Sequence, residues 1–203
     1  MMKKLLLSIG LLTAITTANA QSFKEQIAAH RQKYKDDFLA EQRSPLKAED
    51  LPNLRFFDAD STYSIVAKVE LLQDQPVIKL TTFNGSSQEY VRFAKLTFTL
   101  KGKQLHLTLF KSLSLTAIPQ YKDYLFLPFT DQTNAAESYP GGRYIDINAT
   151  DIKNGALAID FNKAYNPYCA YSDGYRCPVP PMENKLGIRV EAGEKAFAGE
   201  KKH

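Results

Sequence analysis

Histidine and cysteine are scarce in this chain of 203 residues, which has three histidines, two cysteines and no tryptophan. The histidines, His30, His106 and His203, do not follow a metal-binding spacing such as H-E-x-x-H. The sequence also lacks the G-x-S-x-G motif of a nucleophile elbow and a glycine-rich phosphate loop. These absences argue against a metal site and against the enzyme classes that carry such motifs. We therefore expect neither a metal nor a cofactor.

An excess of charge of one sign is also missing. The 26 lysines and arginines nearly balance the 22 aspartates and glutamates, so the net charge is +4. No basic tract of the kind that binds phosphate backbones is present. We therefore expect no nucleic-acid partner.

The first twenty residues hold an apolar run that is too short to cross a bilayer. Lys3 and Lys4 precede a run from Leu5 to about Ile15, and Ala18-Asn19-Ala20 supplies small residues for a signal peptidase. This pattern is typical of a secretory signal peptide; the alternative is an N-terminal anchor. We predict a periplasmic or secreted protein, with no stable membrane insertion after the signal is cleaved.

The remaining chain, about 183 residues long, suits a single domain. The predicted organisation is a signal peptide at 1–20, an N-terminal helix and linker at 21–50, a single β-rich domain at 51–195 and a charged tail at 196–203.

One amphipathic helix is predicted at the start of the mature chain, from Phe23 to Arg43. Ser22 and Glu25 form a capping-box pattern, and Ser44-Pro45 ends the helix. Its apolar stripe favours packing against the domain over binding a partner.

After Pro52 the apolar residues alternate with polar ones, which predicts β-strands. The alternation changes phase between Phe93 and Leu96, so we expect a β-bulge near Ala94-Lys95. Many short strands behind one helix predict a mainly β fold, an antiparallel barrel or sandwich preceded by one amphipathic N-terminal helix. The predicted strands are Tyr63–Leu71, Val77–Phe83, Val91–Leu100, Leu105–Leu109, Tyr124–Phe129, Arg143–Ile147, Leu157–Phe161 and Leu186–Val190.

The strands at 143–147 and 157–161 are predicted to pair and to share one apolar face. A two-residue turn at Asn154-Gly155 would send one apolar set outward, so we expect a longer loop or a bulge between them. Arg143 then falls on the apolar side, and the opposite face holds Asp146, Asp160 and Asn162.

Both cysteines lie in the proline- and tyrosine-rich stretch AYNPYCAYSDGYRCPVPPMENKL, residues 164–186. In an exported protein, the leading interpretation of Cys169 and Cys177 is a disulfide; the alternative is a pair of reactive thiols. The prolines favour a rigid flap over the domain surface. Its tyrosines either cover apolar surface or stack on a ligand.

Several phrases of the sequence carry a family resemblance: RFFDAD, LFLPFTDQT, GGRYIDI, IDFNKAYNPYCAY, CPVPPMENKL and VEAGEK, in this order. With them the chain resembles the bacterial family called domain of unknown function 1684, from about Arg55 to Lys195. The resemblance implies a grouping without an established activity.

The polar residues within these phrases are the candidate site residues: Asp131, Glu137, Tyr139, Arg143, Asp160, Asn162, Asn166, Glu183, Asn184, Glu194 and Lys195. The predicted ligand-binding residues among them are Arg143, Asp160, Asn162, Asn166, Glu183 and Asn184. Arg143 suits a two-pronged contact with a carboxylate or phosphate. Asp160 and Glu183 are candidates for a general acid–base pair.

Each candidate also has a structural alternative. Arg143 would pair with Asp160 or Glu183 at a strand end, and the asparagines would bond to loop backbone. Two function hypotheses remain. The first is an exported cell-envelope protein that binds a small molecule or an envelope component in a pocket beside the disulfide-tied loop. The second is a carboxylate-dependent hydrolase acting on an anionic substrate.

Overall fold

The computed structural model describes residues 22–203, and the predicted signal peptide lies outside this part of the chain. The N-terminal helix covers residues 22–40. The strands and the short helix are β1 (Ser64–Leu71), β2 (Ile78–Thr81), β3 (Ser87–Leu100), β4 (Lys103–Ser112), α2 (Leu113–Thr116), β5 (Tyr124–Phe129), β6 (Arg143–Asn148) and β7 (Ala156–Asp160). The 3-10 helices are η1 (Leu51–Asn53), η2 (Ser61–Tyr63), η3 (Pro119–Tyr121), η4 (Ala149–Asp151), η5 (Phe161–Lys163), η6 (Tyr168–Ala170) and η7 (Met182–Asn184).

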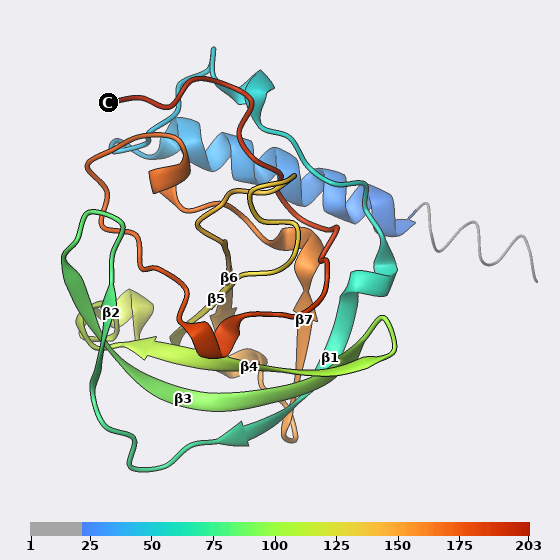
Figure 1. The fold of residues 1–203 in the computed structure, drawn as a ribbon, viewed down its shortest axis with the longest axis vertical. Coiled ribbons are helices and arrows are strands. Elements are labelled where there is room, and N and C mark those ends of the chain that lie inside the picture. The colour runs from blue at the N-terminus through green and yellow to red at the C-terminus, as the bar shows by residue number, and fades with distance from the viewer. Residues whose placement is uncertain (1–21) are drawn as a thin grey trace, which may run out of the picture.

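The seven strands form one antiparallel sheet in the order β6-β5-β4-β3-β1-β7, and β2 pairs with the first part of β3. The sheet curls into a half-barrel around the main core (Figure 1). The predicted mainly β fold with one leading helix is confirmed. The alternating sequence pattern located all seven strands, because each buries one face, β2 in a second cluster and the other six in the main core.

The predicted β-bulge in the third strand is confirmed, close to its expected position. The register between β3 and β4 shifts between Arg92 and Ala94. Before the shift, Tyr90 packs in a second cluster on the opposite face of the sheet. After it, Ala94 and Leu96 lie in the main core. One extra residue therefore moves the apolar side chains from one face to the other.

The predicted last strand, Leu186–Val190, is wrong, because no strand forms there. The segment is nevertheless extended, and the side chains of Leu186, Ile188 and Val190 are buried in the main core. The alternation in the sequence is thus a correct sign of burial. The backbone of this segment bonds to the loop after β5, where Leu186 donates to the Thr130 carbonyl at 2.8 Å and the Ile188 carbonyl accepts from Gln132 at 2.9 Å. This contact forms only one parallel bridge, between Thr130 and Lys185, which is too short to make a strand.

The predicted pairing of the strands at 143–147 and 157–161 is also wrong, because β6 pairs with β5 and β7 pairs with β1. The connection between β6 and β7 is the expected longer loop, containing η4 and a two-residue turn at Asn154-Gly155. Both strands do face the main core with their apolar side chains. β6, at one end of the sheet, is joined to the segment that follows β7 and η5 by a backbone bridge between Tyr144 and Tyr165, with N–O distances of 2.9 and 3.0 Å.

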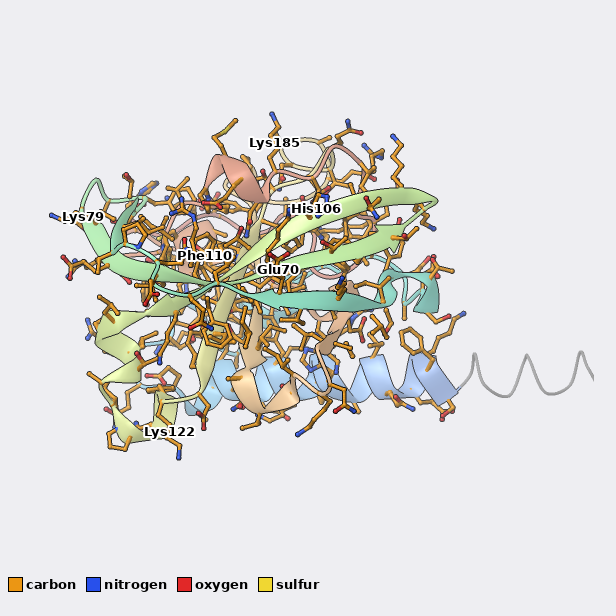
Figure 2. All side chains as sticks on the ribbon, turned by 90° about the horizontal axis from the view of Figure 1, so that it is seen from below. Glu70, Lys79, His106, Phe110, Lys122 and Lys185 are labelled. Atoms are coloured by element: carbon orange, nitrogen blue, oxygen red, sulfur yellow. The ribbon has the colours of Figure 1, made fainter. Side chains whose placement is uncertain are left out.

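The N-terminal helix lies on the side of the molecule opposite to β3 and β4, with side chains filling the layer between them (Figures 1 and 2). Ile27 and Phe38 are buried beneath it, in agreement with packing against the domain. The helix ends three residues before Arg43, and Ser22 is already helical. Within residues 22–203, no helix is long and apolar enough to span a bilayer.

The charged C-terminal residues lie against the domain. Lys202 donates its backbone N–H to the carbonyl of Tyr171 and pairs through Nζ with Asp50. Ala198 donates to the carbonyl of Asn53. The tail therefore joins the linker after the helix to the loop at 164–186.

Candidate functional site

A cavity of about 1680 Å³ lies between the N-terminal helix and the face of β5 and β6 that is turned away from the main core. We call it the helix–sheet cavity. Loops around residues 163–168 and 175–178 complete its walls. Its lining is rich in aromatic rings: Phe23, Tyr34, Phe56, Tyr90, Tyr124, Phe126, Tyr144, Tyr165, Tyr168 and Tyr175.

The aromatic lining arises from the alternation of the two strands. Leu125 and Ile145 point into the main core, whereas their neighbours Tyr124, Phe126 and Tyr144 belong to the opposite face. The rings of Phe126 and Tyr144 meet edge to face at 4.7 Å. These strands thus supply the core and the cavity from opposite sides.

Asp146 is the polar centre of this lining. Its Oδ1 accepts hydrogen bonds from the phenol groups of Tyr124, at 2.8 Å, and Tyr165, at 2.6 Å. Tyr124 is on β5, two residues before Phe126, which is the cross-strand partner of Asp146, and Tyr165 follows η5 at its backbone bridge to Tyr144. Two parts of the chain therefore converge on one carboxylate oxygen.

The Asp146 carboxylate is accessible to solvent within the cavity, although protein surrounds it on most sides. Burial raises the pKa of Asp146, and the hydrogen bonds from Tyr165 and Tyr124 only partly offset this effect. Among residues 22–203, no lysine, arginine or histidine forms an ion pair with it. Burial also raises the pKa of the phenols of Tyr124 and Tyr165, which therefore stay protonated.

Asp160 and Asn162, two of the predicted site residues, also line the helix–sheet cavity. Asn162 donates from Nδ2 to Asp160 Oδ1 at 2.8 Å and to the Asp60 carbonyl at 2.8 Å. The helix residue His30 lines the same region, where burial and the charge of Lys163 lower its pKa. Asp146, Asp160 and Asn162 thus border one space, as their predicted common face implied.

A second carboxylate, Glu194, lies beside the cavity but is fully buried. It accepts from Tyr171 at 2.6 Å, from Tyr34 at 3.0 Å and from the backbone N–H of Asn166 at 2.8 Å. Burial raises the pKa of Glu194 to about 7. Since Tyr34 belongs to the N-terminal helix and also lines the cavity, this cluster fixes one wall of the cavity.

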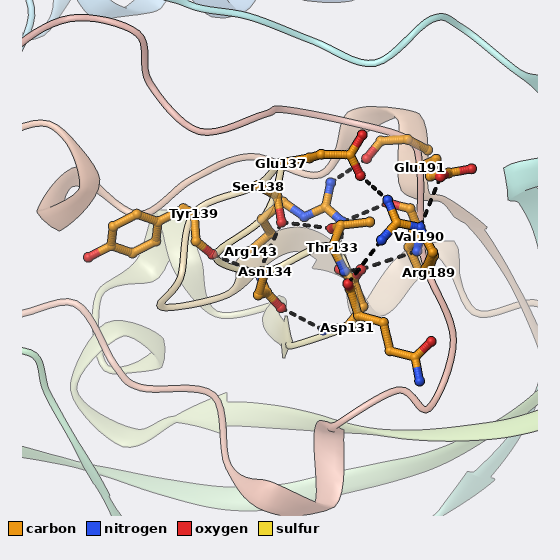
Figure 3. A network of polar contacts seen from close by, with 12 residues as sticks. Asp131, Thr133, Asn134, Glu137, Ser138, Tyr139, Arg143, Arg189, Val190 and Glu191 are labelled. Carbon is orange, nitrogen blue, oxygen red and sulfur yellow. Dashed lines mark hydrogen bonds and ion pairs between the residues drawn. The ribbon is translucent and has the colours of Figure 1, made fainter.

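Arg143 does not line the cavity; it is fully buried at the start of β6. Its Nη2 lies 2.6 Å from Asp131 Oδ2. The structural alternative had expected Asp160 or Glu183 as its partner, and that choice of partner is wrong. Asp131 Oδ1 in turn accepts from the backbone of Thr133 at 2.7 Å and of Val190 at 3.1 Å. Figure 3 shows this network between the loop after β5 and the C-terminal segment.

The same guanidinium donates to backbone carbonyls of the C-terminal segment: Val190 at 2.8 Å, Ala192, and Glu194 at 3.3 Å. Arg143 thus occupies the place of a neighbouring strand for this segment. Its role in this structure is to hold the C-terminal segment on the core.

Asn184 and Glu183 lie at η7, outside the cavity lining. Asn184 donates to the carbonyls of Thr108 and Pro128, at 2.9 and 2.6 Å, and accepts from the Thr108 N–H at 2.7 Å. It joins β4 to β5 where they pair only at Phe110 and Phe126. Glu183 forms an ion pair with Arg92 at 2.8 Å. The structure does not bring Glu183 and Asp160 into one cavity.

The other candidates hold loops together. Asn166 donates from Nδ2 to the Lys195 carbonyl at 2.8 Å, and the Lys195 ammonium lies 4.7 Å above the Phe57 ring. Glu137 pairs with Arg189. The Tyr139 phenol donates to the Cys169 carbonyl at 3.4 Å. The structural alternative for the asparagines, bonding to loop backbone, holds for Asn162 and Asn166, whereas Asn184 bonds to the backbone of two strands.

The predicted disulfide is wrong: Cys169 and Cys177 are free thiols, and both are buried. Cys177 Sγ accepts the backbone N–H of Cys169 at 3.2 Å, and Cys169 Sγ bonds to the Tyr175 carbonyl at 3.3 Å. The sulfur atoms are therefore used in hydrogen bonds that fold the loop locally. Burial raises the pKa of Cys177, which disfavours a reactive thiolate. Among residues 22–203, no group of side chains is arranged to hold a metal ion.

The sequence-based choice of site residues missed Asp146, Tyr124 and Tyr165. The signal was partly present, because Asp146 stands alone between Ile145 and Ile147 on the non-core face of a strand. The two tyrosines carried no such mark. Their convergence depends on the backbone bridge between Tyr144 and Tyr165, which the expected strand pairing did not contain.

Comparison with known proteins places the chain in a family without assigning it an activity. The family model DUF1684, Protein of unknown function, matches residues 49–195. A similar solved structure is the solution NMR structure of the uncharacterized protein from gene locus rrnAC0354 of Haloarcula marismortui. It is 34% identical, with a TM-score of 0.65 over 88% of this chain and 96% of that chain. No curated protein matches. The chain therefore belongs to the DUF1684 family of proteins of unknown function.

Proposed function

We propose that this protein binds a small molecule in the helix–sheet cavity and works in the cell envelope or outside the cell. One observation carries the binding proposal. Asp146 presents a solvent-accessible carboxylate inside a concave, tyrosine-lined space and has no ionic partner among residues 22–203. Ligand sites are typically concave, mostly apolar and equipped with a few convergent polar groups.

The cavity has ample room for a small molecule, and its walls are preformed. Typical ligand pockets measure about 300–1,000 Å³, and the helix–sheet cavity, at about 1680 Å³, exceeds this range. Its walls come from the sheet, the helix and two loops, which fixed contacts such as the Tyr34–Glu194 hydrogen bond hold in place. Such a preformed site loses little free energy to ordering when the ligand binds.

The location in the envelope rests on residues 1–20, whose basic start, apolar run and Ala18-Asn19-Ala20 ending suit an export signal. Mass spectrometry of the protein from an extracytoplasmic fraction is the test. We expect the mature N-terminus near Gln21. An intact Met1 in a protein confined to the cytoplasm would refute export.

The hydrolase hypothesis is not carried further, because its acid–base pair is not assembled. Asp160 borders the cavity, whereas Glu183 pairs with Arg92 at η7. General acid–base catalysis requires both groups within reach of one substrate.

The binding proposal is tested with a cavity-filling variant and its strand neighbour. Ala158 lines the cavity, and its cross-strand partner Val66 is exposed and does not line it. A thermal-shift screen of amines, sugars, carboxylic acids and short peptides should find compounds that stabilise the wild type. Val66→Phe should keep this stabilisation and Ala158→Phe should lose it. No stabilising compound, or equal binding by both variants, would contradict a ligand in this cavity.

A further inference from the structure

We infer that the ligand carries a primary ammonium group, which is bound by Asp146 Oδ2 together with the phenol oxygens of Tyr124 and Tyr165. This inference rests on the proposed binding function and names the class of ligand. Three features of the cavity around Asp146 support it: the free hydrogen-bond acceptors, the unpaired negative charge and the surrounding aromatic rings.

The hydrogen bonds at Asp146 leave only acceptors facing the cavity. The phenol hydrogens of Tyr124 and Tyr165 are both donated to Oδ1. No residue in the described part of the chain donates to Oδ2, which is left with free lone pairs. Each phenol oxygen can still accept one hydrogen bond. Three acceptors and no free donor match an ammonium group, which has three donors and no acceptor.

The charge at this point also needs a cation. A carboxylate in a concave, partly desolvated site is unfavourable unless it is paired. The other basic side chains of the lining are engaged or displaced from it. Arg31 donates to the Phe57 carbonyl at 2.7 Å, and Arg176 donates to Ser86 Oγ at 3.2 Å. Lys33 pairs with Asp37 at 2.7 Å, and the charge of Lys163 acts on His30, where it lowers the pKa. A cationic ligand would supply the missing counterion.

The aromatic rings around Asp146 suit the same group. Tyr165 lies 5.9 Å from the Tyr144 ring and 6.1 Å from the Tyr34 ring, between ring centroids. The ring centroids of Tyr144 and Phe126 lie 4.7 Å apart. Ring faces attract an ammonium group and its first methylene groups, and this attraction is stronger where water is excluded. The rest of the ligand is then expected to be apolar or aromatic.

Matched pairs of compounds isolate the charge from the rest of the ligand. Calorimetric titrations at pH 7.5 would compare tyramine with N-acetyltyramine, hexylamine with hexanol, and glucosamine with N-acetylglucosamine. We expect the amine of at least one pair to bind, and its neutral counterpart to bind about 30-fold or more weakly, as for loss of a desolvated charge pair. Equal or tighter binding of the neutral members would overturn the ammonium assignment and leave the cavity proposal standing. If nothing in these pairs or in the wider screen binds, both proposals fail together.

Two variants tie the amine to the named atoms. Asp146→Asn keeps the oxygen that the tyrosines bond and removes the charge, so the fold should persist while amine affinity falls about 30-fold or more. Tyr165→Phe keeps the ring and removes one acceptor, with an expected loss of about 10-fold. Asp74→Asn, an exposed charge loss between β1 and β2, is the matched control and should bind as the wild type. Unchanged amine binding by Asp146→Asn would refute the inference.

Discussion

Arg143 and Asp131 form an ion pair with 2.6 Å between Nη2 and Oδ2, and neither side chain has any exposed surface. The pair joins the loop after β5 to the first residue of β6, and Arg143 extends it to the C-terminal segment. The guanidinium that the sequence suggested as an anion clamp is therefore a structural group.

Replacing Arg143 by alanine should cost stability, because it leaves Asp131 charged, buried and without its cation. Breaking a buried pair in this way costs about 3–5 kcal/mol. Urea denaturation followed by circular dichroism would measure the lower free energy of unfolding. Arg189→Ala is the control, since Arg189 is 43% exposed in its ion pair with Glu137, and it should cost about 1 kcal/mol or less. Equal costs for the two variants would contradict the structural role of Arg143.

Asn184→Asp should weaken the contact between β4 and β5. A carboxylate cannot donate to the carbonyls of Thr108 and Pro128, which now receive the two amide hydrogens. We expect a loss of about 2–4 kcal/mol from the unfolding free energy. Hydrogen exchange at the Thr108 amide should become faster. Asn148→Asp, at an exposed cap where aspartate works equally well, should leave both measurements unchanged; slow exchange at Thr108 in Asn184→Asp would speak against this bridge.

Glu194 should make the protein less stable as the pH rises. Burial raises its pKa from 4.5 to about 7 in the folded state, so between these values the folded chain keeps a proton that the unfolded chain releases. The stabilisation is complete below the unfolded pKa and is lost as the pH passes through 7, a total of about 3 kcal/mol. Unfolding free energies of the wild type and Glu194→Gln between pH 4.5 and 8 would reveal it.

The Glu194→Gln variant should show a flatter pH dependence than the wild type in that interval. Glu191→Gln removes an exposed carboxylate from the same segment and serves as the control. Parallel curves for the wild type and Glu194→Gln would show that this carboxyl group does not titrate as described.

The two cysteines should titrate as thiols. Denatured protein that has never met a reductant should react with two equivalents of a thiol reagent, because Cys169 and Cys177 are unbridged. The folded protein should react slowly, since both thiols are buried and the pKa of Cys177 is raised. Absence of reactive thiols after denaturation would show that a bridge forms in solution.

Local patterns were sufficient to locate the seven strands and the bulge. Period-two alternation placed β5 correctly at both ends, and the phase change around Phe93 located the register shift. These features depend on which face of a strand is buried, and the order of apolar and polar residues along the strand shows this directly. The burial of Leu186, Ile188 and Val190 was recorded equally well.

Partners that lie far apart in the sequence were not predictable in this way. The pattern at Leu186–Val190 cannot distinguish a neighbouring strand from the partners that its backbone has, the loop after β5 and the Arg143 side chain. The cysteine spacing indicated proximity, which is correct, but it could not report how the sulfurs are bonded. The site at Asp146 depends on the curl of the sheet that brings Tyr165 to β6, and no local pattern encodes that curl.

The C-terminal segment has a consequence for how the chain acquires its structure. A ribosome that has made all seven strands has not yet made Leu186, Ile188 and Val190, which fill the half-barrel. The nascent chain therefore cannot complete its hydrophobic interior during most of its synthesis. A chain truncated just before Leu186 should keep the apolar interior of the sheet exposed to solvent, and it should therefore aggregate.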